Sequence, residues 1–64
     1  MITLEEQLAE VQRELGTRRY LYPQQVRDGK MGVAEADYRI EVMAAVRDTL
    51  LAQSIKSRKI GEEI

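Results

Sequence analysis

The chain has 64 residues, a formal net charge of −1, and neither cysteine nor histidine. A chain of this length forms one domain at most, and the missing residue types exclude disulfides and the usual zinc sites. A free nucleic-acid-binding module is usually clearly basic, so the charge disfavours that class. Because a core of fewer than about 70–80 residues rarely stabilises a fold by itself, we expect the chain to associate as a homodimer.

The apolar residues are too dispersed for a membrane span or a secretory leader. No apolar stretch approaches the roughly 18 residues of a spanning helix, and the first six residues are acidic and lack the continuous apolar run of a signal peptide. The absence of cysteine fits a reducing compartment. We therefore expect a cytoplasmic protein that does not contact a membrane.

A first helix is expected over about residues 3–28. Thr3 followed by Glu6 is the capping-box pattern of a helix N-terminus. Apolar residues then recur with 4-3-4 spacing, and the same seam extends to three further positions. The seam consists of Leu4, Leu8, Val11 and Leu15, then Arg18, Tyr22 and Val26.

Two residues of this segment disturb the pattern. Arg18 at a seam position either packs its stem and extends its head to water, or pairs with a carboxylate. Pro23 either kinks the helix, which then continues to Asp28, or ends it near Leu21. Because Tyr22 and Val26 continue the seam, we expect a kink near Pro23.

A second helix is expected over about residues 33–55. Gly29 is a typical C-terminal stop for the first helix, and Gly32 precedes Val33 as a helix N-cap. Isolated isoleucines among charges predict a frayed tail at residues 58–64.

The second helix carries two apolar stripes. The first stripe consists of Val33, Ala36, Ile40, Met43 and Leu50, and the second of Tyr38, Val42, Ala45 and Thr49. The second lies about 160–200° around the helix from the first. One partner helix needs only one apolar face, so a second face requires a second partner. Since the middle of the second stripe is small, we expect this helix to pack against its own copy through Val42, Ala45, Val46 and Thr49.

Charge favours an antiparallel pairing of the two helices. Residues 1–15 sum to −3, residues 16–30 to +3, residues 31–50 to −2 and residues 51–64 to +1. In a hairpin, the acidic start of the first helix lies beside the basic tail. The predicted fold is all-α: one domain over residues 1–64, a two-helix antiparallel hairpin, dimerised into a four-helix assembly.

Candidate partner-binding residues are Arg13, Arg18, Tyr20 and Tyr38, because arginine and tyrosine are frequent interface anchors. The segment 18–23, rich in arginine and tyrosine, has two other interpretations: a solvated basic face beside one seam tyrosine, or a clamp for phosphates and bases. Nothing indicates catalysis, a cofactor or a metal. Serine occurs only at positions 54 and 57, the carboxylates are spread along helical faces, and the glycines lack phosphate-binding spacing.

The order of several short motifs resembles a family of proteins from Mu-like temperate phages and proteobacterial prophages. The resembling elements are Leu4-Glu5-Glu6-Gln7 with Val11 and Arg13, Tyr22-Pro23, Gly29-Lys30-Met31, Ala34-Glu35-Ala36-Asp37, Arg39-Ile40, Met43, Val46 and Thr49-Leu50. They cover about residues 3–51. Gly32 departs from the expected serine or threonine cap. Within this family the chain is similar to quorum-sensing anti-activators of Pseudomonas phages.

The resemblance implies a small helical dimer in the host bacterial cytoplasm. Such a dimer binds and silences a LuxR-type transcription regulator of the host by stoichiometric masking, and also engages a pilus assembly ATPase. Two other classes stay open. One is a nucleic-acid accessory protein that uses Arg13, Arg18, Arg19, Arg27 and Lys30, and the other is a structural coiled-coil protein of a phage particle.

Overall fold

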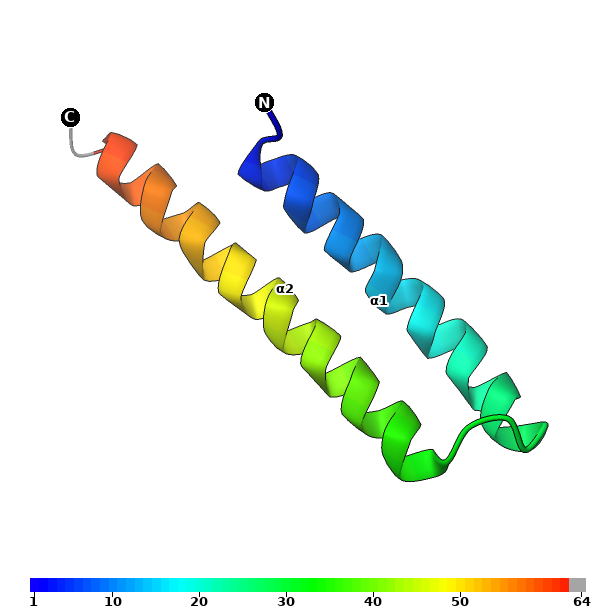
Figure 1. Ribbon diagram of the computed structural model, residues 1–64. Helices are drawn as coiled ribbons and strands as arrows, with labels where there is room; N and C mark the ends of the chain where they lie inside the picture. The colour runs from blue at the N-terminus through cyan, green and yellow to red at the C-terminus, as the bar shows by residue number, and fades with distance from the viewer. Residues whose placement is uncertain (63–64) are drawn as a thin grey trace.

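The chain forms an antiparallel helical hairpin in a computed structural model that describes the backbone of residues 1–62 and the side chains of residues 1–56. Helix α1 spans Leu4–Arg27 and helix α2 spans Val33–Glu62. The helices pack against each other, and the start of α1 lies at the same end of the hairpin as the end of α2 (Figure 1). The described part contains no strand, so the predicted all-α hairpin is confirmed.

The start of α1 follows the predicted capping pattern. The Thr3 hydroxyl oxygen accepts a hydrogen bond from the Glu6 backbone N–H at 3.0 Å, and Glu5 and Glu6 place negative charge in the first turn. A capping side chain satisfies one of the four N–H groups that a helix start leaves without a partner. The predicted N-cap is confirmed.

The helix continues through Pro23 and ends at the predicted glycine. Pro23 lies inside α1, so the prediction that the helix passes this residue is confirmed. Gly29 has φ +72°, and its N–H donates to the Val26 carbonyl at 3.1 Å, while the Lys30 N–H donates to the Gln25 carbonyl at 2.8 Å. This pair of bonds is a Schellman motif, which needs a left-handed residue that glycine adopts without steric cost.

Helix α2 begins as predicted and ends later than predicted. The Ala36 N–H donates to the Gly32 carbonyl at 3.0 Å, which places Gly32 at the N-cap. The predicted end at residue 55 is wrong, since α2 extends to Glu62. No proline or glycine lies between Val33 and Gly61, so helix propensity carries α2 past the predicted end. The prediction of a frayed tail over residues 58–64 lies outside the residues whose side chains are described.

The interior of the hairpin is one seam with very little buried volume. Leu15 and Ala36 are 3 % and 5 % exposed, and no other described residue is buried. The rest of the seam is half-buried, namely Leu4, Leu8, Val11, Tyr22, Val26, Ile40, Met43 and Leu50. The predicted seam of α1 is therefore confirmed from Leu4 to Val26. A two-helix layer leaves one side of every seam residue near water, and this explains why so few are fully covered.

One residue of the first apolar stripe of α2 is mostly exposed. Val33 shares this face with Ala36 and Ile40, but its side chain is 61 % exposed. It is the first residue of α2, where the chain has just left the turn and α1 has already ended. The helical period places Val33 on the side of α2 that faces α1. Because α1 ends at Arg27, no further turn of α1 covers this side chain.

Candidate protein-interaction surfaces

The outer face of α2 carries an exposed apolar stripe. Tyr38, Val42 and Val46 are 66 %, 41 % and 39 % exposed. The four predicted dimer residues, Val42, Ala45, Val46 and Thr49, line one shallow hollow together with Leu50. The structure thus brings these four residues together on one surface, on the side of α2 that α1 leaves uncovered. A second, more polar hollow follows on the same helix, lined by Thr49, Ala52, Gln53 and Lys56.

Two of the four predicted partner-binding residues lie on the outer face of α1. Tyr20 is 70 % exposed. Arg13 forms an ion pair with Glu10 at 2.8 Å, and both side chains are mostly exposed. An exposed pair of this kind contributes little to stability and leaves the guanidinium accessible. Tyr20 and Arg13 therefore share one surface, which is separate from Tyr38 on α2.

Arg18 occupies the seam and contacts both helices. Its Nε donates to Glu14 Oε1 at 3.0 Å, and its Nη1 donates to the Arg39 backbone carbonyl of α2 at 2.9 Å. The guanidinium also lies 6.0 Å from the centre of the Tyr22 ring, which is at the outer limit of a cation–π contact. The alternative in which Arg18 pairs with a carboxylate is the one observed. Its role in binding a partner stays a prediction.

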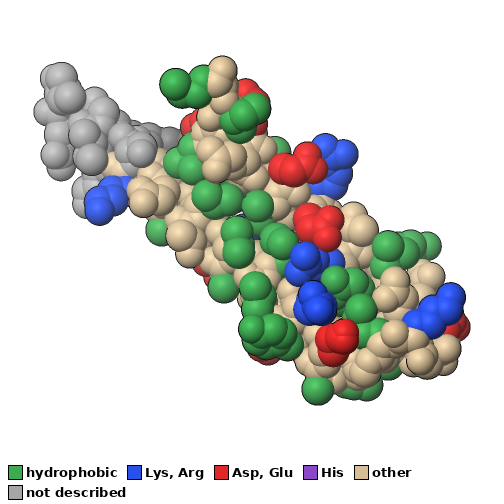
Figure 2. Space-filling view, in the orientation of Figure 1, with side chains coloured by type: hydrophobic (Ala, Val, Ile, Leu, Met, Phe, Trp, Pro, Cys, Tyr) green, Lys and Arg blue, Asp and Glu red, His purple; other side chains and the backbone are tan. Residues whose placement is uncertain are grey.

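The contacts of Arg18 belong to a short charged network across the seam. Arg39 lies 3.7 Å from Glu35 Oε1 on α2, so two ion pairs, one on each helix, are linked by the bond from Arg18 to the Arg39 carbonyl. Figure 2 shows basic and acidic side chains side by side in the middle of the visible face. This network joins the helices with polar groups at a level where the apolar seam is interrupted.

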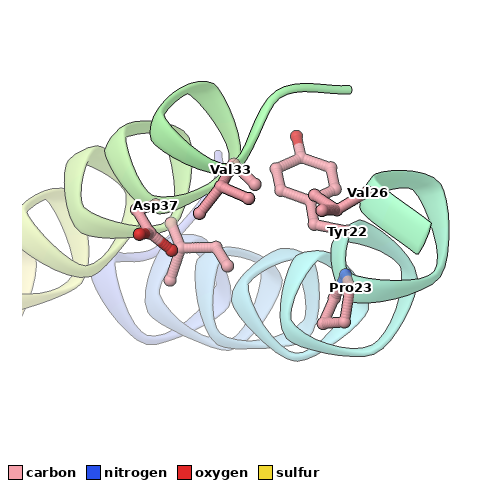
Figure 3. Close-up of a pocket in the computed structure, with 7 residues that line it drawn as sticks. Tyr22, Pro23, Val26, Val33 and Asp37 are labelled. Carbon is pink, nitrogen blue, oxygen red and sulfur yellow. The ribbon is translucent and has the colours of Figure 1, made fainter. Parts of the chain in front are cut away.

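A groove between the helices opens at the turn end of the hairpin, and no motif in the sequence predicted it directly. Its lining residues are Tyr22, Pro23, Val26, Val33, Ala36, Asp37 and Ile40. Figure 3 shows Val33 and Asp37 on α2 and Tyr22, Pro23 and Val26 on α1. The only available signal was the small side chain of Ala36 at a seam position beside the proline of the other helix. The groove is apolar except for the Asp37 carboxylate and the Tyr22 hydroxyl.

The described residues do not meet the requirements of a metal site, a membrane span or an unpaired buried polar site. They contain no cluster of three or more acidic residues that could hold a metal ion. No helix in this part of the chain has the length and apolarity to cross a membrane. Every buried polar side-chain atom in the same part has a hydrogen-bond partner. The candidate interaction surfaces are the α2 stripe, the outer face of α1 and the groove.

Comparisons with protein-family models, curated proteins and solved structures found no match to this chain. The surfaces of the hairpin are therefore the basis for assigning a function.

Proposed function

We propose that this protein acts by binding other proteins rather than by catalysis, as a phage-encoded inhibitor in the host bacterial cytoplasm. The observation that carries the proposal is the exposed apolar stripe of α2, opposite a seam in which Leu15 and Ala36 are the only buried residues among those whose side chains are described. A hairpin with so little interior gains stability when a second surface covers this stripe. The chain also lacks the histidine and cysteine side chains that most often act as bases and nucleophiles.

The first partner in this proposal is a second copy of the chain. The centre of the stripe is small at Ala45, which lets two α2 helices approach closely around a two-fold axis. Two hairpins would then form a four-helix assembly with α2 in the middle, and each α1 would cover the outer side. This arrangement leaves Arg13 and Tyr20 accessible at the surface.

The second partner in this proposal is a host regulator of the LuxR type, with a pilus assembly ATPase as a further target. The choice of targets rests on the resemblance to phage anti-activators. Tyr20 and Arg13 on α1, and Tyr38 at the end of the α2 stripe one turn before the dimer residues, supply exposed anchors of the residue types that dominate interfaces. The dimer would mask the surface that the regulator needs for assembly or DNA binding. Nucleic-acid binding is less favoured, because the net charge of the chain is −1 and the Arg18 guanidinium is held by Glu14 and by the Arg39 carbonyl.

The dimer is tested by the substitution Ala45→Glu. Two carboxylates at the centre of an apolar contact have no partner charge, so we expect sedimentation velocity to give monomer, or circular dichroism to give unfolded chain. The matched control is Ala9→Glu on the exposed side of α1, which should leave a folded dimer. A normal dimer with Ala45→Glu would overturn this part of the proposal.

The host target is tested by affinity capture of the tagged protein from a Pseudomonas lysate, with nuclease present and washes at moderate salt. We expect a LuxR-type regulator or a pilus ATPase in near-stoichiometric amount, and loss of that capture with Tyr38→Ala or Tyr20→Ala in dimers of normal mass. Recovery of self alone, or of material that nuclease removes, would reject the inhibitor function. A phosphate binder would also lose affinity steeply with salt.

A further inference from the structure

The groove at the turn end has the size of a binding site for one bulky side chain. It encloses about 250 Å³ between α1 and α2. A cavity of about 150 Å³ lined by aliphatic residues is large enough to take up benzene, so this groove can accommodate an aromatic or branched aliphatic side chain. Its open side is bordered by the exposed residues Pro23, Val33 and Asp37, which lets a chain segment enter while its backbone stays outside.

The groove exists because the hairpin does not fill it. Ala36 is buried at its floor, but its side chain is one methyl group and leaves space below Tyr22 and Val26. Val33 stands at the rim with most of its surface in water. When a partner covers exposed apolar side chains beside an unfilled hollow, the apolar area removed from water favours binding.

Charge at the rim selects among possible occupants. Asp37 is the one charged residue that lines the groove, and no lysine or arginine nitrogen of the described side chains lies within 4.0 Å of its carboxylate. An apolar site with one unpaired carboxylate favours an apolar group that carries a positive charge and disfavours one that carries a negative charge.

We propose that this groove binds a segment of another protein in which a bulky apolar side chain is followed by lysine or arginine. The apolar side chain enters between Tyr22, Val26 and Ile40, and the cation pairs with Asp37 at the rim. The inference rests on the groove alone. It requires neither the α2 dimer nor a LuxR-type target, because the lining residues lie outside the α2 stripe.

Three acetylated and amidated tetrapeptides test the proposal: Gly-Phe-Lys-Gly, Gly-Phe-Gln-Gly and Gly-Phe-Glu-Gly. Each is titrated into the ¹⁵N-labelled protein and followed by amide chemical shifts. We expect shifts centred on the lining residues and affinity in the order Lys, Gln, Glu. The Lys peptide should bind roughly two- to fivefold more tightly than the Gln peptide, which is the range for a partly exposed ion pair.

Two variants change the charge of the groove, and the second also replaces one apolar residue of its lining. Asp37→Asn should remove the preference for Lys over Gln and keep the binding of the Gln peptide. Val33→Lys changes an exposed residue one turn before Asp37, so it neutralises the carboxylate in cis and weakens binding of the Lys peptide. The matched control is Gln12→Lys, on an exposed position of α1, which should bind like the unmodified protein.

Shifts spread over the whole chain, equal affinity for the three peptides, or an unchanged Lys preference in Asp37→Asn would overturn the proposal. Phenethylammonium alone is the last probe. If it binds as tightly as the Lys peptide, the groove takes a small amine and the protein-segment assignment is wrong. Sedimentation of the same samples reports the dimer independently, so failure here and failure of the α2 interface are distinguishable.

Discussion

Arg18 is the residue whose replacement tests the packing of the hairpin most directly. Its guanidinium donates to Glu14 Oε1 at 3.0 Å within α1 and to the Arg39 carbonyl of α2 at 2.9 Å, and its side chain is 20 % exposed. The substitution Arg18→Met keeps an unbranched apolar stem as far as the position of Nε and removes every donor. It therefore isolates the polar network from the packing of the stem.

The expected loss follows from the two bonds. A hydrogen bond to a charged group contributes about 1.5–3 kcal/mol, and a half-exposed ion pair such as Arg18–Glu14 contributes less than about 1 kcal/mol. Water can reach the Arg39 carbonyl at the edge of so thin a seam, which places the hydrogen-bond term at its lower end. We expect Arg18→Met to lower the free energy of unfolding by about 2 kcal/mol.

Urea unfolding followed by circular dichroism measures this loss. With a slope of about 1–2 kcal/mol per M for a small protein, the midpoint should fall by about 1 M or more. All samples need the same protein concentration, because association shifts apparent stability. The control Arg13→Met removes a mostly exposed pair and should change stability by less than about 0.5 kcal/mol. Equal midpoints for the two variants would refute the role assigned to Arg18.

The remaining predictions concern the two ends of α1 and one glycine inside it, and they are read from the same unfolding curves. Thr3→Ala removes the hydroxyl that accepts from Glu6 and should cost about 1 kcal/mol; no change would contradict the capping role. Gly29→Ala forces a side chain into the left-handed conformation at φ +72° and should destabilise by about 1 kcal/mol. Gly16→Ala should instead stabilise by up to about 1 kcal/mol, since a Cβ there meets no atom within 4 Å. Opposite signs for these two alanines are the expected result, and equal signs would contradict it.

Local sequence features predicted the elements of this fold because their causes lie within a few residues. The hydroxyl of Thr3 caps the helix that begins one residue later, and the conformation of Gly29 ends it. The 4-3-4 spacing from Leu4 to Leu15 placed the seam on the correct face of α1, because the helical period alone decides which residues share a face. Four of the five residues that line the first α2 hollow, from Val42 to Thr49, follow from the same period.

Other features depend on how one helix lies against the other, and only the tertiary structure decided them. The sequence placed Arg18 on the seam but left its partners open, and the register between the helices brought the Arg39 carbonyl within reach. The sequence placed Val33 on the inner face, but the end of α1 left it exposed beside Asp37. Periodicity fixes direction around a helix axis, whereas register, helix length and the space between two helices arise only when the turn sets their relative position.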